Sequence, residues 1–377
     1  MRIDKCHQRL EMRIDKCHQI GLLFPYLIVL SLIWHETNMR KTNPETHQAC
    51  RSLLQKAVRR GDVSLTQQVA YHLHTIGDTS WLRTRALVIV FEECWPLAAW
   101  QHLTTNIQSV FDMLVSIGRA VKMKDAAGLG TLAYELSRGD TSVLTGETED
   151  QHIQHLCGAL KDPNNFWDWA VKKSSSKEQF ALVEAAHKAY RRGGWPWDRA
   201  FMQASAYLAV HTDKLVVSEA GQNQEKFPLW IALDKHTSQG KIALREAAAG
   251  IGVPVRQLSW ISFYCESARL NEATDSYWWS REVCWRFSRI GLNYEKAQAL
   301  WSKAQPIVSG LLKEETEALQ QHLSTASSSE NCNKTDQQLC IQELLWEREV
   351  SDAPLKELFR TSNIFRDKPE PSRLPGF

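Results

Sequence analysis

The sequence predicts an all-α protein, a multi-helix array with either one continuous core or two loosely separated ones. Along most of the chain after Met39, apolar residues recur at the spacing of helices that bury one face. Glycines, prolines and capping residues end and restart this pattern at short intervals. No alternating strand pattern and no β–α–β rhythm is seen, so we expect no parallel sheet.

The composition is that of a globular protein, with 43% hydrophobic and 23% charged residues in a chain of 377. Because 45 basic residues are balanced by 43 acidic ones, the net charge is only +2. Whole-chain charge therefore gives no support to nucleic-acid binding, and any such surface has to be a local patch. The 15 tryptophans are expected mainly in packing, because each ring buries a large apolar area.

The nine cysteines form no CxxC motif and are odd in number. They fit neither a disulfide framework nor a zinc module, and they favour reduced thiols in a cytoplasmic protein. His72 and His74 do not share a helical face, whereas His152 and His155 could chelate an ion on a helix. We predict neither a metal nor any other cofactor.

Residues 1–38 are expected to be a non-native extension, with Met39 as the natural start. The sequence MRIDKCHQ at 1–8 recurs at 12–19, and such a perfect short repeat has no evident role in a fold. The apolar run at 20–34 is shorter than the roughly 20 residues of a membrane span. A weak signal-anchor is the alternative, and we otherwise expect no membrane partner.

Residues 39–140 are predicted to form a first helical region. Asn43 and Pro44 suit the cap and first position of its first helix, and Gly61 and Gly77 end its first two helices. The apolar run 86–91 fits a buried helix or a strand about equally well. The expected helical stretches are 53–58, 69–76, 81–93 and 96–121.

A boundary near 139–151 is expected to precede a second helical region at 150–323. Asp162 and Pro163 suit a cap and first helical position, and Gly193–Trp197 is a clear helix breaker. The expected helical stretches are 167–173, 178–191, 198–209, 239–249, 253–269, 278–290, 294–303 and 307–323. Residues 324–377 are expected to hold a linker, one short helix and a mobile tail.

The stretch Cys50–Cys94 resembles a helical segment of a known family. The matching residues are Lys56, Arg59, Arg60, Gly61, Asp62, Ala70, Leu73, Arg83, Arg85, Val88, Ile89, Glu92 and Glu93. The family is the replication-associated recombination ATPases, also called MgsA-like or Werner-helicase-interacting-like proteins. In that family the segment follows a clamp-loader-like ATPase core and supports oligomerisation and DNA-linked work at stalled forks.

The resemblance implies a region like a clamp-loader collar or lid, and it favours a helix over a strand for 81–93. It covers about 45 of the 377 residues. The chain departs from the family because it contains no G-x-x-x-x-G-K-[ST] phosphate loop. The nearest match, Ser238–Lys241, lacks the leading glycine and the trailing hydroxyl. We therefore expect no ATP hydrolysis.

A basic cluster in this stretch is the first candidate site. The candidate nucleic-acid-binding residues are Lys56, Arg59, Arg60, Arg83 and Arg85. Lys56 and Arg60 are four apart and share a helical face, from which they could contact phosphates without reading sequence. The alternative is that Arg59 and Arg60 interact with carbonyls at the helix end, or pair with Glu92 and Glu93.

A second cluster precedes a predicted helix and is a candidate anion site. Its residues are Asp234, Lys235, His236, Thr237 and Lys241. A cap by Thr237, with Lys235 and His236 near the helix N-terminus, could hold an anion such as phosphate. Asp234 and His236 could instead form a catalytic dyad, although the sequence places no Ser or Cys nucleophile beside them. Capping and packing alone is the third alternative.

An aromatic and basic patch is the third candidate. It comprises Trp278, Arg281, Trp285 and Arg286. Interleaved Trp and Arg can stack single-stranded bases. The alternative is a helix buried between its neighbours, with Arg side chains reaching the surface.

Three function hypotheses follow from these observations. The first is a non-catalytic protein associated with DNA replication or recombination, which contacts DNA, a replication or repair ATPase, or a second copy of itself. The second is a structural or regulatory interaction protein without nucleic-acid contact. The third is a hydrolase built around Asp234 and His236.

Overall fold

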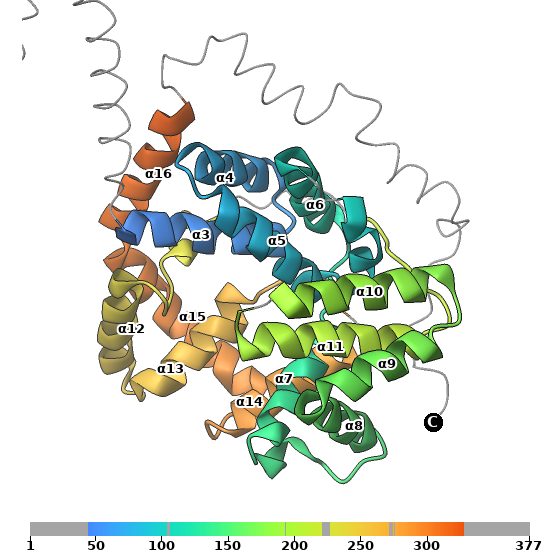
Figure 1. Cartoon of the computed structure of the whole chain (residues 1–377). Coiled ribbons are helices and arrows are strands. Elements are labelled where there is room, and N and C mark those ends of the chain that lie inside the picture. The colour runs from blue at the N-terminus through green and yellow to red at the C-terminus, as the bar shows by residue number, and fades with distance from the viewer. Residues whose placement is uncertain are drawn as a thin grey trace, which may run out of the picture. The chain divides into compact units, whose positions relative to one another are not determined.

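Fourteen α-helices and no β-sheet make up the described residues of the computed structural model, which confirms the all-α prediction (Figure 1). The structure describes residues 44–103, 106–192, 194–220, 227–270, 274 and 276–327. Packing divides the chain into two units, Met1–His47 and Gln48–Phe377. Apart from the first turn of α3, every helix that the structure describes lies in the second unit.

The helices follow one another with short connections. They are α3 Pro44–Arg59, α4 Val63–Thr75, α5 Thr79–Glu93, α6 Ile107–Arg119, α7 Asp125–Ser137, α8 Asp150–Lys161, α9 Pro163–Lys173, α10 Lys177–Arg192, α11 Pro196–Val210, α12 Ser238–Ile251, α13 Val255–Ser262, α14 Tyr277–Ser288, α15 Tyr294–Leu311 and α16 Lys313–Ser327. Short 3₁₀ turns are η1 Trp95–Leu103, η2 Thr141–Val143 and η3 Leu229–Ala232, and η4 Phe263–Ser267 is a π-helical turn.

The first three helices end where the sequence predicts. Gly61 and Gly77 have φ of +70° and +89°, a left-handed conformation that glycine adopts without strain. Asp62 caps α4 by accepting a hydrogen bond from the Leu65 amide at 2.9 Å. The apolar run in α5 is buried from Val88 to Phe91, so the helical alternative for this run is confirmed.

The predicted helical stretch 96–121 is divided in the structure. Its first part is the 3₁₀ turn η1, and α6 begins only at Ile107. Asn106 starts α6 by accepting a hydrogen bond from the Ser109 amide at 2.9 Å. The apolar periodicity extends across both parts because both face the core, and therefore it does not mark the break between them.

Two glycines let α7 approach its neighbours closely. α7 packs against α8, α11 and α14 (Figure 1). A Cβ atom at Gly128 would lie 2.3 Å from backbone atoms of Trp278 in α14. One at Gly130 would lie 2.9 Å from the Ala200 carbonyl oxygen in α11. These contacts need helix backbones with no side chain between them.

The C-terminal helices differ from the sequence prediction in their boundary. We expected separate stretches at 294–303 and 307–323, but α15 runs through Pro306 and ends at Leu311. Proline removes one backbone donor from a helix. Here both Pro306 and Ser302, whose carbonyl loses that donor, are exposed, so water can hydrate the freed carbonyl.

Several predictions concern residues that the structure does not describe. The extension at 1–38 and most of the segment 324–377 lie outside the described residues. The division into regions 39–140 and 150–323 stays a prediction, although α7 on one side of it packs against α8, α11 and α14 on the other. Among the described helices, none has the length and apolar character that a bilayer span requires.

Candidate functional site

A cavity of about 780 Å³ lies where α3, α5, the start of α11, the turn before α12, η4 and α14 meet. Its volume falls in the range of ligand-binding pockets. The cationic lining residues are Arg51, Lys56, Arg59, Arg85, Lys235 and Arg286. The acidic lining residues are Glu92, Asp198, Asp234 and Glu282.

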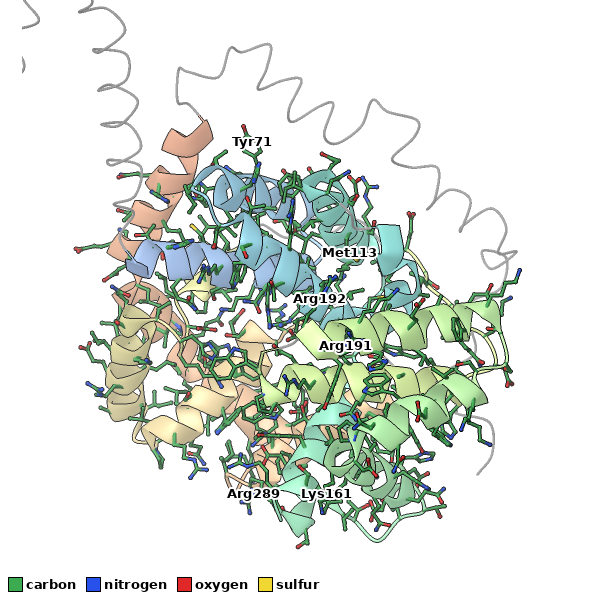
Figure 2. All side chains as sticks on the ribbon, in the orientation of Figure 1. Tyr71, Met113, Lys161, Arg191, Arg192 and Arg289 are labelled. Carbon is green, nitrogen blue, oxygen red and sulfur yellow. The ribbon has the colours of Figure 1, made fainter. Side chains whose placement is uncertain are left out.

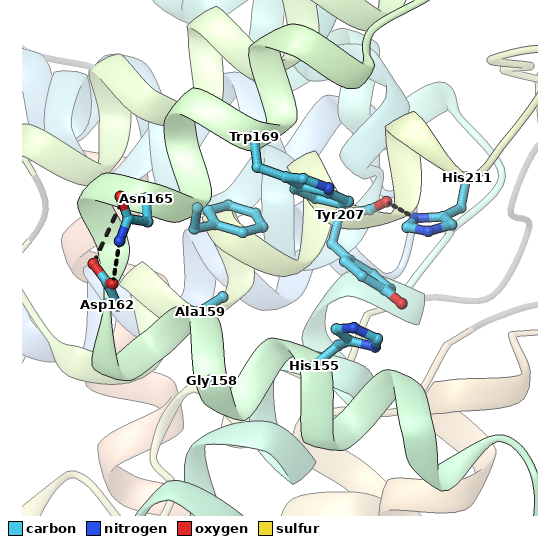
Figure 3. Close-up of a pocket in the computed structure, with 9 residues that line it drawn as sticks. His155, Gly158, Ala159, Asp162, Asn165, Trp169, Tyr207 and His211 are labelled. Carbon is cyan, nitrogen blue, oxygen red and sulfur yellow. Dashed lines mark hydrogen bonds between the residues drawn. The ribbon is translucent and has the colours of Figure 1, made fainter.

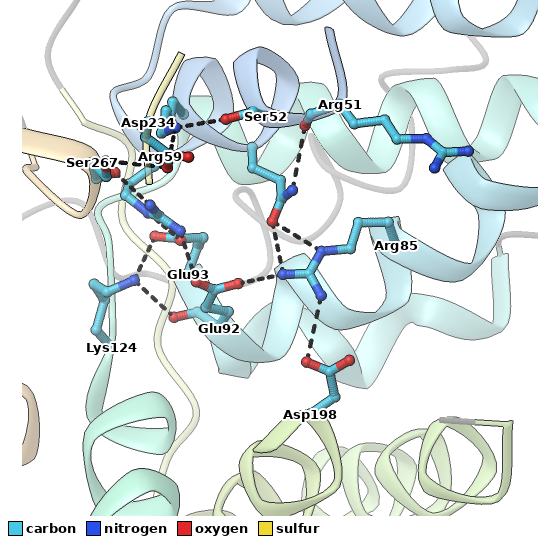
Figure 4. Close-up of polar contacts among 12 residues, drawn as sticks. Arg51, Ser52, Arg59, Arg85, Glu92, Glu93, Lys124, Asp198, Asp234 and Ser267 are labelled. Atoms are coloured by element: carbon cyan, nitrogen blue, oxygen red, sulfur yellow. Dashed lines mark hydrogen bonds and ion pairs between the residues drawn. The ribbon is translucent and has the colours of Figure 1, made fainter. Parts of the chain in front are cut away.

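One wall of the cavity is a network of buried ion pairs (Figure 4). Arg59 donates to Glu92 at 2.7 Å and to Glu93 at 2.6 Å, and Lys124 donates to the other oxygen of Glu93 at 2.9 Å. Although burial alone would raise the pKa of Glu92, Arg59, Lys124 and Arg85 lower it to about 2. The network therefore holds fixed, opposite charges side by side at neutral pH.

Arg85 extends this network across the cavity to α11. Its guanidinium donates to the Gln55 side chain at 2.8 Å and 3.0 Å, and to Glu92 at 3.1 Å. It also reaches Asp198, near the start of α11, at 3.4 Å (Figure 4). Three helices are thus joined through one side chain.

Lys56 and Asp234 form a second buried pair. The Lys56 ammonium donates to Asp234 and to the Ser52 hydroxyl, both at 2.6 Å. Burial alone would raise the pKa of Asp234, but Lys56 and the hydrogen bond from His236 hold it well below its usual range. The Nδ1 atom of His236 lies 3.0 Å from Oδ1 of Asp234. Because an ionised carboxylate can only accept a hydrogen bond, Nδ1 is the ring nitrogen that carries the proton. The Nε2 atom of this imidazole is then the basic one.

Lys235 differs from the other cations in the cavity. Its ammonium lies 3.9 Å from the ring centre of Trp260 and 4.2 Å from that of Phe263. Burial lowers its pKa to about 8. Among the described residues, each other cationic lining residue has a carboxylate within 4 Å, and Lys235 has none.

Glu282 and Tyr264 are a coupled pair deeper in the cavity. The Tyr264 hydroxyl donates to Glu282, and burial raises the pKa of this glutamate to about 7. Arg286 is stacked between the rings of Trp260 and Trp285, at 4.3 Å from each ring centre. It also reaches Glu135 at 3.4 Å. Glu282 can therefore change charge near neutral pH inside a cationic setting.

Exposed aromatic and basic residues lie at the connection between α10 and α11. Trp195 is 72% exposed and Trp197 is 38% exposed, and both line the cavity. Arg191 and Arg192 in the last turn of α10 are exposed (Figure 2). This connection is the breaker predicted at Gly193–Trp197, and it places indole rings where a ligand could stack on them.

The predicted basic cluster does not form one exposed surface. Lys56, Arg59 and Arg60 are buried, with 3%, 6% and 5% exposure. Arg60 pairs with Glu266 at 2.5 Å, while Arg83 is exposed and Arg85 is half-buried. The pairing of Arg59 with Glu92 and Glu93 is the alternative that the sequence left open. Nucleic-acid contact by these residues stays a prediction.

The predicted anion cluster is brought together only in part. Asp234, Lys235 and His236 line the cavity. Thr237 caps α12 as predicted, by accepting a hydrogen bond from the Gly240 amide at 3.1 Å. Lys241 is exposed and does not line the cavity.

The predicted aromatic and basic patch is mostly buried packing, which is the alternative that the sequence left open. Trp278 is 1% exposed and Trp285 is 7% exposed. Arg281 pairs with Asp150, and the Trp285 indole donates to the Ser142 hydroxyl at 3.0 Å. Only Arg286 lines the cavity. The large apolar area of the indoles favours their burial in α14.

A second cavity of about 350 Å³ lies between α8, α9 and the end of α11 (Figure 3). Trp169, Tyr207 and His211 line it with their rings, and His155 faces them from α8. His155 and His152 were predicted as an alternative chelating pair. His152 is instead buried against the Tyr207 hydroxyl, with its Nδ1 atom 2.7 Å away.

Comparison of the chain with protein families, curated proteins and solved structures found no match. The resemblance of 50–94 to the recombination ATPases is therefore still a prediction.

Sequence reasoning missed several residues of the cavity. Glu282 and Tyr264 lie on helical stretches that were predicted, but nothing in the local sequence marks them as a coupled pair. Trp195 and Trp197 were recognised only as part of a breaker. The sequence signal that could have identified them is a Trp-Pro-Trp run directly after Arg191, Arg192 and two glycines.

Proposed function

We propose that the protein binds single-stranded nucleic acid, without cleaving it, by means of the charged cavity. The observation that carries this proposal is Lys235, whose ammonium faces the cavity between two aromatic rings and has no carboxylate within 4 Å among the described residues. A phosphate group is a suitable partner for such a cation.

The aromatic side chains at the cavity support a strand over a simple anion. Base faces stack on indole rings without regard to sequence, and Trp195 and Trp197 offer such rings. Arg191 and Arg192, in the last turn of α10, add positive charge that would attract a phosphate backbone. A cavity of about 780 Å³ has room for one or two nucleotides and not for a duplex.

The setting of this activity comes from the resemblance of 50–94 alone. On that basis we propose a role in DNA replication or recombination, with a replication or repair ATPase or a second copy of the chain as partner. The buried arginines would then hold the helices of the site in place, and the contacts to the strand would come from the cavity.

The test is fluorescence anisotropy with a short labelled single-stranded oligonucleotide. Lys235→Ala should weaken binding about tenfold or more, because a charge-assisted hydrogen bond is lost. Trp195→Ala should cost about 1–3 kcal/mol if one base stacks there. Binding should also weaken as salt increases, and as the pH rises above about 8, where Lys235 loses its proton.

Two variants serve as matched controls. Lys241→Ala removes an exposed lysine outside the cavity, and Phe180→Ala removes a ring that is 47% exposed on α10. Both should bind as the wild type does. Absence of binding at low salt, or wild-type affinity in Lys235→Ala and Trp195→Ala, would refute the proposal.

A hydrolase is the second candidate, and the contact of Asp234 with His236 Nδ1 at 3.0 Å favours it. A carboxylate that orients an imidazole in this way is typical of a general base. Among the described residues, no serine or cysteine is within hydrogen-bonding distance of His236. Cleavage of the oligonucleotide in the same assay, abolished by His236→Ala, would favour this candidate over non-catalytic binding.

A further inference from the structure

Three side chains from distant parts of the chain meet at one buried point. Cys50 is in α3, His72 is in α4 and His322 is in α16, which lies beside α4 (Figure 1). The Cys50 sulfur and one ring nitrogen of each histidine all lie within 4.8 Å of one another. The Nε2 atoms of His72 and His322 are 3.0 Å apart.

We propose that Cys50, His72 and His322 bind a zinc ion. Thiolate and imidazole are the ligands that zinc prefers. Bond lengths of about 2.0–2.1 Å to nitrogen and about 2.3 Å to sulfur place tetrahedral ligand atoms roughly 3.3 to 3.6 Å apart. The two Nε2 atoms are 3.0 Å apart and all three ligand atoms lie within 4.8 Å of one another, so side-chain movements of about 1 Å would bring them to this spacing.

Binding has a defined proton balance. Burial raises the pKa of Cys50 to about 12, so the side chain is a neutral thiol without metal. Zinc takes the thiolate, and one proton leaves for solvent as the zinc–sulfur bond forms. Both Nε2 atoms must offer a lone pair to the ion, so both rings then carry their remaining proton on Nδ1 and one of them changes tautomer. With three ligands from the described residues, one tetrahedral position is left for water or another ligand.

The ion would join α16 to the helices around it. Among the described residues of α16, Leu319 and Leu323 are the buried hydrophobic side chains. A bond from His322 to a metal that Cys50 of α3 and His72 of α4 also bind would link α16 covalently, through the ion, to these two helices. Because zinc would bind the folded chain and not the unfolded one, the melting temperature should rise with zinc concentration.

The full chain, stripped by a chelator, is titrated with cobalt(II) and with zinc. The wild type should give the thiolate-to-cobalt charge-transfer band and bind zinc. In Cys50→Ala, His72→Ala and His322→Ala zinc affinity should fall more than about 100-fold, since even loss of an outer-shell partner costs 10- to 100-fold.

Controls separate ligand loss from general damage. Cys94→Ala removes another fully buried cysteine, and His74→Ala removes a histidine of α4 that hydrogen-bonds to Thr79 instead. Both should keep the cobalt band and the zinc affinity. If Cys50→Ala does not fold, His322→Gln on the half-buried α16 position gives the same test. An unchanged cobalt spectrum in the Cys50 and His322 variants would overturn the proposal.

Discussion

Glu282 is a buried acid whose ionisation the surrounding structure opposes. The carboxyl is 3% exposed and accepts a hydrogen bond from Tyr264. Burial raises its pKa from 4.5 to about 7. The folded chain therefore keeps a proton that the unfolded chain releases near pH 4.5. The stability that this proton gives is complete below pH 4.5 and is lost as the pH rises to about 7.

We predict that Glu282→Gln stabilises the protein at pH 8 by an amount on the order of 1–3 kcal/mol. Glutamine keeps an acceptor for Tyr264 and removes the cost of a buried charge. The gain should shrink between pH 7 and 4.5, where the wild-type acid is itself protonated.

Urea unfolding of both proteins across this range measures the difference. His152, which is buried, and His322, which is half-buried, have pKa values lowered by desolvation and act in the opposite direction near pH 6.5. The histidines are the same in both proteins, so their contributions cancel when the free energy of unfolding of the wild type is subtracted from that of the variant. A gain that does not depend on pH would mean that Glu282 is ionised throughout.

The burial of Lys56 and Arg60 could not be predicted from the local sequence. The spacing of Lys56 and Arg60 predicts a shared helical face, but α3 ends at Arg59 and both side chains are buried. Their burial depends on Asp234 and Glu266, which come from much later in the chain. Charge pairing at such separations leaves no periodic signal, so exposed and buried cations look alike in the sequence.

At the scale of elements, Gly128 lets the backbone of α7 lie directly against that of α14. A methyl group at Gly128 would overlap backbone atoms of Trp278, so Gly128→Ala must push the two helices apart. We expect a loss of about 1–3 kcal/mol, the usual cost of overpacking.

Gly158 in α8 is the matched control for this prediction. It is an exposed helical glycine, and a Cβ atom there would meet nothing within 4 Å. Gly158→Ala should stabilise the protein by about 0.5–1 kcal/mol, because alanine is the better helix former. Chemical denaturation of both variants gives the comparison, and a stable Gly128→Ala protein would contradict the packing described for α7.

The sequence predicts helices well where their ends are defined locally. Asp162 and Thr237 cap the helices that follow them, as residue type and position predicted. The predicted helix boundaries are wrong where tertiary packing, and not the local sequence, determines the backbone conformation. Pro306 stays within α15, and the segment after Pro96 is a 3₁₀ turn, because burial of neighbouring apolar residues outweighs local preference.

For the whole molecule, the sequence gives the class of fold but not how distant segments meet. The buried core extends as one cluster from Ala49 to Leu323. Contacts such as Lys56 with Asp234 and His72 with His322 join its two ends. Neither pair follows from spacing along one helix, and this is why the cavity could only be predicted in fragments, as separate basic and anion clusters.

Because the core is continuous, we expect the described helices to unfold as one cooperative unit. If 39–140 and 150–323 were separate domains, they would unfold separately in denaturant. Because α7 packs against α8, α11 and α14, we expect amide protection in α5 and in α11 to be lost at the same urea concentration. Hydrogen exchange followed by mass spectrometry resolves the two helices.

Gly128→Ala makes this test sharper. The substitution acts where α7 meets α14, so in a single cooperative unit it should lower the protection midpoints of α5 and α11 equally. In a divided molecule the two helices would respond differently. Midpoints that already differ in the wild type would restore the two-region organisation, and the cavity would then lie between two parts that can move apart.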